Sequence, residues 1–280
     1  MGILKANITK TLQGASQPIA MNIGLNIQKG SFIGLYGSSG SGKTTILRIL
    51  AGLEDSDSII TFCNNIWQND NNFKKTSNRD ISFVFQDYAL FPNMNVEQNI
   101  LFANNDKELL DKLLNITKLT RLKNAMPHNL SGGQQQRVAL CRAIISKPKL
   151  LLLDEPFSAL NDDLKDNLYK ELKKIHNQFN FTTIIVSHNK IELFKLCSNI
   201  YHISNGEVIN YDKPSNIFLE DNSELLKAIV VGKKPHLHND NYNIIITVLN
   251  KFFTISTSEK QYNNTIIGDI LEFNISNYHV

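Results

Sequence analysis

The chain has 280 residues, of which 42% are hydrophobic and 20% are charged, and its formal net charge is +3. This length suffices for one large domain with a small appendage, and the composition is typical of a globular protein rather than a disordered one. Because the net charge is so small, the sequence gives no reason to expect a nucleic acid or another polyanion as a partner.

The cysteines and the N-terminal segment favour a reduced, cytosolic compartment. Cys63, Cys141 and Cys197 are far apart and form no CxxC pair, so we expect neither a disulfide framework nor a zinc site. Residues 1–10 include polar side chains where a signal peptide needs an apolar core. The most apolar run, residues 150–153, is much shorter than the roughly 20 residues that cross a bilayer, so a membrane role would require a partner.

The first half of the chain predicts the beginning of an α/β fold. Residues 5–12 and 19–28 alternate loosely and are expected to be strands. A short apolar strand at 31–36 then leads through the glycine-rich segment 37–42 into a helical pattern at 44–53. Strand, glycine loop and helix in this order are typical of a phosphate-binding fold. The next segment, 56–75, is polar and rich in turn residues.

The second half continues the alternation of strands and helices. Continuous apolar runs predict buried parallel strands at 81–85, 150–153 and 182–186, and the Asn205-Gly206 pair predicts a hairpin turn. Helical periodicity covers residues 96–122, 134–146 and 165–179. We place a domain boundary near 231–240 and expect strands at 244–249, 252–257, 265–267 and 270–275. This tail of about forty residues is too short to bury an independent core.

The strongest chemical signal is a full match to the pattern GxxxxGK[ST]. It comprises Gly37, Ser38, Ser39, Gly40, Ser41, Gly42, Lys43, Thr44 and Thr45. Such a loop turns backbone N–H groups toward phosphates, and the helix that follows favours anions at its N-terminus. Lys43 is expected to reach the β- and γ-phosphates of ATP, and the Thr44 hydroxyl to hold Mg²⁺. A chance glycine-rich turn is the alternative, but the preceding strand and following helix argue against it.

Three other strands are followed by polar residues that suit phosphate hydrolysis. Asp154 and Glu155 follow the run 150–153; Asp154 is expected to hold Mg²⁺ and Glu155 to orient or deprotonate the attacking water. His188 follows 182–186 and is expected to contact the γ-phosphate. Gln86 follows 81–85, where its amide suits a residue that senses the metal and the water. Taken singly, each could be an ordinary polar residue at a strand end.

A second anion-binding helix terminus is predicted by Ser131, Gly132, Gly133 and Gln134. Ser131 is a good N-cap, and the glycines permit close backbone approach at the start of the helix 134–146. The glycine loop already serves the one nucleotide expected per chain. This terminus is therefore either an ordinary capped helix or a clamp for ATP bound to another copy, which requires a dimer.

These motifs, in this order and approximate spacing, resemble the ABC ATPases over residues 5 to about 211. The resemblance implies a P-loop core with an antiparallel β subdomain, a helical insert at about 88–126 and a short C-terminal β tail; the ATP-binding domain is residues 1–231 and the extension 232–280. It also implies two nucleotide-binding subunits that enclose two ATP molecules. Each site then combines one chain's glycine loop with Ser131–Gln134 of the other. The insert is expected to dock on an integral-membrane permease at the cytoplasmic face of the cell membrane.

Finer similarities concern the transported solute. Residues 85–92 and 96–100 resemble bacterial importers served by a substrate-binding protein, and residues 8–12 and the tail are most similar to molybdate importers, so molybdate or a related oxyanion is expected. Residues 268–270 and 275–280 resemble one edge of an oxyanion-binding barrel. The chain departs from the family at Asn161, where aspartate is usual, and near Leu12, where many relatives stack an aromatic residue on adenine.

Three alternatives remain open at this point. The chain could drive import of another solute, such as iron, sulfate or a polyamine. It could be a non-transport ABC ATPase that acts on ribosomes or DNA, although it has one cassette and no long coiled-coil insertion. It could also be a binding module that senses an oxyanion through the tail.

Overall fold

The computed structural model describes residues 2–13, 18–158, 160, 162–219, 226–235, 242–248 and 251–273. The chain divides into two compact units, Met1–Ile217 and Phe218–Val280. This division falls earlier than the boundary that the sequence predicts near 231–240, because strand β12 (Leu226–Pro235) runs without interruption into that region. Asn161 and residues 275–280 lie outside the described part of the chain.

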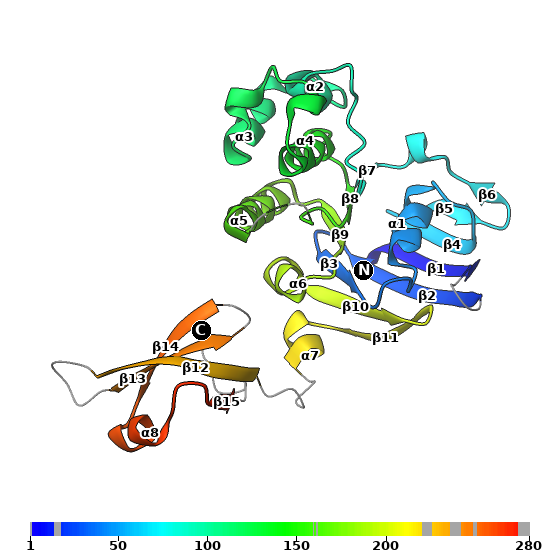
Figure 1. The fold of residues 1–280 in the computed structure, drawn as a ribbon. Coiled ribbons are helices and arrows are strands. Elements are labelled where there is room, and N and C mark those ends of the chain that lie inside the picture. The colour runs from blue at the N-terminus through cyan, green and yellow to red at the C-terminus, as the bar shows by residue number, and fades with distance from the viewer. Residues whose placement is uncertain are drawn as a thin grey trace. The chain divides into compact units, whose positions relative to one another are not determined.

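The described part of the first unit forms an eleven-stranded sheet (Figure 1). Its order is β6-β5-β4-β1-β2-β11-β10-β3-β9-β8-β7. The strands are β1 (Gly2–Leu12), β2 (Ile19–Gln28), β3 (Phe32–Tyr36), β4 (Asp57–Phe62), β5 (Asn65–Asn69), β6 (Asn72–Phe73), β7 (Ile81–Val84), β8 (Leu150–Asp154), β9 (Thr182–Val186), β10 (Asn199–Ser204) and β11 (Glu207–Asp212). Strands β10, β3, β9, β8 and β7 pair in parallel, whereas β4, β5 and β6 pair antiparallel beside β1 and β2.

The parallel register brings the carboxyl ends of four strands together. Val186 at the end of β9 pairs with Leu35 of β3 and with Asp154 of β8, and Val84 at the end of β7 pairs with Leu153. Strands β8 and β9 are buried at every position, which explains their continuous apolar sequence. The segments that follow these strands therefore start from one edge of the sheet, as the sequence predicts.

The helices of the first unit include one group that stands apart from the antiparallel strands (Figure 1). That group contains α2 (Val96–Leu101), α3 (Lys107–Ile116) and α4 (Gly132–Ile145). The others are α1 (Lys43–Ala51), α5 (Asp162–Phe179), α6 (Lys190–Leu196) and α7 (Pro214–Leu219), with short 3₁₀ turns at Thr76–Asn78, Thr120–Leu122 and Pro127–Asn129. No helix among the described residues is both long and apolar enough to cross a membrane.

The polar, turn-rich segment 56–75 also contains β4, β5 and β6, which its local sequence pattern does not predict. Along β4 the side chains of Ser58, Ile60 and Phe62 are buried, while Asp57 and Ile59 are exposed. This alternation was obscured by the polar and turn-forming residues that surround it. The antiparallel pairing of β4 with β1 supplies the missing information, since it defines which face is buried.

The second unit is a four-stranded antiparallel sheet with the order β14-β13-β12-β15. It comprises β12, β13 (Tyr242–Val248), β14 (Lys251–Thr257), α8 (Glu259–Asn264) and β15 (Ile270–Phe273), with Val230, Ile244 and Ile246 buried in its small core. The predicted strand at 265–267 is instead a turn, in which the Ile266 N–H donates to Asp269 Oδ2 and Gly268 adopts a φ of 101°.

A buried histidine joins α5 to the sheet. His176 is 4% exposed, and its ring nitrogens lie 3.0 Å from Thr183 Oγ1 and 3.0 Å from the Gly30 carbonyl oxygen. A carbonyl only accepts, so Nε2 carries the proton and Nδ1 accepts from the Thr183 hydroxyl. Burial lowers the pKa of His176 below its ordinary value of 6.5. The folded state therefore holds this imidazole neutral.

We predict that His176 makes stability fall as the pH drops below its unfolded pKa, because the unfolded chain then binds a proton that the folded chain binds less readily. His176→Gln should lower the free energy of unfolding at pH 8 by about 1–3 kcal/mol through loss of the two hydrogen bonds. Between pH 8 and pH 5.5, the free energy of unfolding of the variant should fall by less than that of the native chain, as measured by urea denaturation. Equal pH dependence would contradict this, and His128→Gln on the surface is the control.

Candidate functional site

The glycine loop between β3 and α1 depends on backbone conformations that suit glycine. Gly37, Gly40 and Gly42 have φ values of 155°, 80° and 93°. A Cβ at Gly37 would lie 2.0 Å from the Ile203 carbonyl oxygen, and one at Gly42 would lie 2.9 Å from Leu12 Cδ1. The loop therefore passes close to its neighbours at both ends before α1 begins at Lys43.

Lys43 lies inside this loop, as the motif predicts. It is 5% exposed, and its Nζ donates to the carbonyl oxygens of Gly37 and Ser38 at 3.0 and 2.7 Å and to Ser41 Oγ at 3.3 Å. Burial lowers the pKa of Lys43, and the carboxylates of Glu155 and Asp154 oppose that shift. The loop thus holds an ammonium group where the phosphates of a nucleotide are expected.

Two oxygen ligands meet next to the lysine. The Thr44 hydroxyl donates to Asp154 Oδ1 at 3.1 Å, across the gap between α1 and the end of β8. Burial raises the pKa of Asp154, while the Thr44 hydrogen bond and the Lys43 charge lower it. Hydroxyl and carboxylate oxygens are the donors that Mg²⁺ prefers, and Mg²⁺ commonly takes one or two protein ligands beside phosphate oxygens. The pair therefore fits the predicted metal.

Glu155 has the features of a general base. Its backbone is left-handed, with a φ of 48°, and its side chain is 15% exposed. Burial, together with the negative charges of Glu192 and Asp154, raises the pKa of the carboxyl group to about 7. Its Oε1 lies 3.3 Å from His188 Nε2 but accepts no hydrogen bond from the described residues. This oxygen is therefore a buried acceptor that has no hydrogen-bond donor among those residues.

Lys43, Thr44, Glu155 and His188 line one cleft of about 630 Å³, and Asp154 is bonded to it through the Thr44 hydroxyl. The lining residues are Leu12, Gln13, Ser39, Gly40, Gly42, Lys43, Thr44, Thr45, Gln86, Glu155, Ser158, Val186 and His188. The structure therefore brings Gln86 and His188, from two different strand ends, beside the glycine loop. No Phe, Tyr or Trp is among these described lining residues, which include Leu12.

The segment Ser131–Gln134 is built as predicted but does not line this cleft. Ser131 and Gln134 form a reciprocal capping box at the start of α4: the Gln134 N–H donates to Ser131 Oγ at 3.4 Å, and the Ser131 N–H donates to Gln134 Oε1 at 2.9 Å. Ser131 and Gly132 are exposed. The helix terminus is thus presented on the surface rather than to the glycine loop of its own chain.

The insert exposes one aromatic side chain and covers another in part. Phe102 is 61% exposed, and its ring centroid lies 4.5 Å from that of Phe91. The Arg142 guanidinium lies over the Phe91 ring, with Cζ 5.1 Å from the ring centroid. The Phe91 backbone N–H also donates to the buried Asn99 side chain at 2.9 Å. Phe91 is therefore partly covered, and Phe102 is the more exposed of the two rings.

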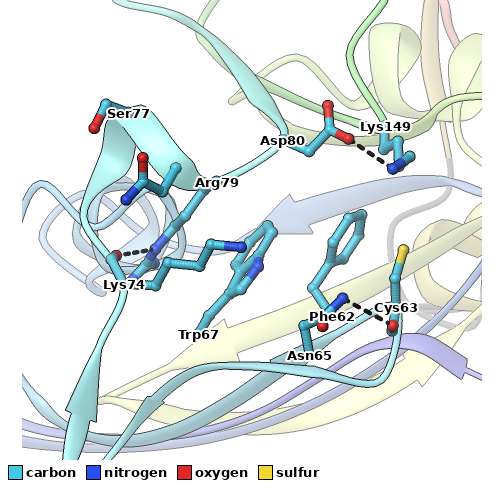
Figure 2. A pocket seen from close by; sticks show the side chains of 10 residues that line it. Phe62, Cys63, Asn65, Trp67, Lys74, Ser77, Arg79, Asp80 and Lys149 are labelled. Carbon is cyan, nitrogen blue, oxygen red and sulfur yellow. Dashed lines mark hydrogen bonds and ion pairs between the residues drawn. The ribbon is translucent and has the colours of Figure 1, made fainter.

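A smaller cleft, of about 390 Å³, lies beside the amino ends of β7 and β8 (Figure 2). Two of its cationic side chains, Lys149 and Arg79, already have partners. Lys149 Nζ lies 2.8 Å from Asp80 Oδ2, and Arg79 donates to the carbonyl oxygens of Lys74, Ile49 and Leu50. Because ligands of open α/β sheets bind at the carboxyl ends of the strands, this cleft is not part of the phosphate site.

The fold and the cleft define a P-loop ATPase of the ATP-binding-cassette type. A family model described as ABC transporter matches residues 20–158. A sulfate/thiosulfate import ATP-binding protein CysA from Mesostigma viride is 37% identical over 273 residues, which cover 94% of this chain and 76% of that protein. The chain therefore belongs to the ABC transporter ATP-binding family, and it is an ATP-hydrolysing transport ATPase of importer type.

Two further relatives have similar names. A probable sulfate/thiosulfate import ATP-binding protein CysA from Chlorella vulgaris is 39% identical over 236 residues, covering 78% of this chain and 97% of that protein. An Fe(3+) ions import ATP-binding protein FbpC from Fusobacterium nucleatum is 36% identical, covering 84% of this chain and 64% of that protein. The importer prediction is confirmed, but these relatives give no support to the narrower likeness to molybdate importers.

Solved structures agree with the fold. The ATP-binding cassette MJ0796, in a dimeric post-hydrolysis state bound to ADP and Pi, superposes with a TM-score of 0.66 and 30% identity, covering 75% of this chain and 98% of that chain. A second dimeric structure of the same cassette gives a TM-score of 0.65. The predicted fold class is therefore confirmed.

Some lining residues had no signal in the sequence. Gln13, Ser158 and Val186 line the cleft, and buried Gln136 donates from Nε2 to the Glu155 carbonyl oxygen at 3.3 Å. Gln136 comes four residues after the start of α4 at Gly132 and resembles any other polar helix residue. Only the packing of α4 against the end of β8 reveals its contact with the backbone of Glu155.

We predict that Gly37→Ala and Gly40→Ala differ in their effect on stability. Both residues have positive φ, but a Cβ at Gly37 would collide with backbone whereas one at Gly40 meets nothing within 4 Å. Gly37→Ala should cost on the order of 3 kcal/mol of unfolding free energy and abolish ATP binding, and Gly40→Ala about 1 kcal/mol. Urea denaturation and calorimetric titration with ATP measure the two quantities. Equal destabilisation by both substitutions would disprove the close approach at Gly37.

Proposed function

We propose that this chain is the motor subunit of an importer for a tetrahedral oxyanion, with ATP hydrolysed at the cleft between the glycine loop, β8 and β9. The observation that carries the proposal is the meeting of Lys43, Thr44, Asp154, Glu155 and His188 at one sheet edge. They come from three separate segments of the chain: the start of α1, the end of β8 and the residues after β9. Their chemistry covers phosphate binding, metal binding and activation of water.

The chain's own residues divide the work of hydrolysis. Residues 37–45 bind the phosphates through backbone N–H groups and Lys43, and Thr44 and Asp154 hold the metal ion. When bound there, Mg²⁺ neutralises negative charge on the phosphates. The Glu155 carboxylate accepts a hydrogen bond from the attacking water and takes its proton, since its raised pKa suits a base that works near neutral pH. His188 contacts the γ-phosphate beside it, and Gln86 orients the water and the metal.

A second copy completes the site. The capped helix start at Ser131–Gln134 presents backbone N–H groups and a helix dipole to the surface, away from its own glycine loop. Two chains arranged head to tail would place this terminus of each over the ATP of the other. The dimeric form of the similar cassette MJ0796 supports this arrangement.

The permease is the second partner. The exposed ring of Phe102 on the helical insert offers an apolar contact surface next to Phe91 and Arg142. Docking of the insert on a permease would hold the chain at the cytoplasmic face of the cell membrane. A substrate-binding protein would deliver the solute to that permease from the opposite side.

The solute is proposed from the relatives and from the sequence together. Two of the similar proteins are named for sulfate and thiosulfate import, and the motif resemblance indicates molybdate. Sulfate and molybdate share a tetrahedral dianionic form, so both lines of argument favour an oxyanion, with sulfate or thiosulfate ahead of molybdate. Iron is the second candidate, favoured by the similarity to FbpC.

We predict that Glu155→Gln retains ATP affinity but blocks turnover, because the side chain keeps its shape and loses its basicity. The loss should be at least about a hundredfold in kcat. The trapped ATP state should then form dimers, measurable by gel filtration with light scattering. Ser131→Arg in the same background should prevent that dimer, and Lys43→Ala should prevent it by weakening ATP binding. A Glu155→Gln chain that stays monomeric with bound ATP would refute the shared site.

We predict that deletion of the gene abolishes uptake of radiolabelled sulfate at low external concentration. The native gene should restore uptake, and the Glu155→Gln form should not, because uptake requires hydrolysis. Excess unlabelled thiosulfate or molybdate, added separately, ranks the competing oxyanions. Unchanged sulfate uptake together with lost ⁵⁵Fe uptake would replace the oxyanion proposal with the iron alternative.

A further inference from the structure

A buried carboxylate outside the motifs lies close to the segment that carries His188. Glu192, on α6, is 3% exposed and does not line the nucleotide cleft. It accepts a hydrogen bond from Ser187 Oγ at 2.6 Å and another from the Tyr169 hydroxyl at 2.9 Å, and Lys165 Nζ lies 3.5 Å from it. Burying a carboxylate costs free energy unless hydrogen bonds or an opposite charge compensate it. Here two hydroxyl groups donate to Glu192, and one lysine lies close to it.

One end of this cluster holds the segment that carries His188. Ser187 directly precedes the histidine, and its Oγ also accepts from the Asn189 N–H at 3.0 Å. The Asn189 side chain in turn caps α6 by accepting from the N–H groups of Ile191 and Glu192. The residues on both sides of His188 are therefore bonded to a network centred on Glu192, while the histidine side chain itself is 57% exposed.

The other end of the cluster holds α5, the helix that follows the Glu155 segment. The Tyr169 ring packs edge-on against Phe157 with centroids 5.0 Å apart, and Phe157 is fully buried two residues after Glu155. Through Tyr169 and Ser187, Glu192 thus connects the segment that follows Glu155 to the segment that carries His188. The side chains of Glu155 and His188 also approach each other directly, with Oε1 and Nε2 3.3 Å apart.

We propose that Glu192 is a positioning residue for hydrolysis, which holds the Ser187–Asn189 turn against α5 so that His188 stays beside Glu155 and the γ-phosphate. The inference rests on the proposed roles of His188 and Glu155. It assigns a function to a residue that lies outside the recognised motifs and does not touch the nucleotide cleft.

The chemistry requires a carboxylate rather than an amide. Both hydroxyl groups donate, and the two oxygens of Glu192 accept one hydrogen bond each. A glutamine at this position would offer one accepting oxygen and direct an NH₂ group at the second hydroxyl. The volume would be preserved, but one charge-assisted bond would be lost, and such bonds are about twice as strong as neutral ones.

The test measures kcat and KM for ATP in the full-length chain at a temperature well below its unfolding transition. Glu192→Gln should lower kcat about tenfold and change KM less than about twofold, since substrate binding uses other residues. Ser187→Ala, which removes the 2.6 Å bond from the other side, should do the same. The matched control is Glu171→Gln, a surface glutamate on α5 paired with Lys174, which should leave both constants unchanged.

A second arm separates positioning from a purely structural role. In the His188→Ala background, measured by single-turnover hydrolysis of radiolabelled ATP with excess protein, Glu192→Gln should lower the rate less than about twofold. An equal fall in both backgrounds would overturn the proposal, as would a native kcat in folded Glu192→Gln and Ser187→Ala chains. If His188→Ala hydrolyses ATP at the native rate, the proposed role of the histidine fails first, and the inference fails with it.

Discussion

The parallel pairing of β3, β9, β8 and β7 is the constraint on which the site depends. Parallel strands all end at the same edge of a sheet, so the segments after each strand are neighbours in space although they are far apart in sequence. Leu35, Val186 and Asp154 are joined by this register. A shift by one residue would turn every side chain to the opposite face, and the burial of β8 and β9 on both faces makes such a shift costly.

Several charged side chains are buried together at this edge of the sheet. Their burial would be unfavourable if the opposite charges did not stabilise one another. Lys43, Asp154 and Glu155 are all largely buried. Burial lowers the pKa of the lysine and raises the pKa of each carboxyl group, which favours the neutral form in every case. The lysine and the carboxylates oppose those shifts through their opposite charges. Under the proposed function, the phosphates of ATP and Mg²⁺ would bring further charges of both signs, so binding would complete the electrostatics of the site.

The segments that carry Glu155 and His188 are held by buried polar contacts as well as by apolar packing. The Gln136 amide donates to the carbonyl oxygen of Glu155, whose backbone is held in a left-handed conformation. Glu192 receives two hydroxyl donors from the strand end and from α5. Such buried polar contacts are directional, so they restrict position more tightly than apolar contacts of the same area.

The sequence by itself determined the phosphate loop and the capped start of α4. It also determined that three apolar strands are followed by Gln86, by Asp154 and Glu155, and by His188. These features are local: glycine permits the positive φ of Gly37 and Gly42, and the Ser131 hydroxyl caps the start of α4 by accepting from the Gln134 N–H. The tertiary structure alone decided the strands within 56–75, the replacement of a predicted strand by the turn at Gly268, and the network around Glu192. Each of these depends on partners distant in the chain, which no local pattern of residues specifies.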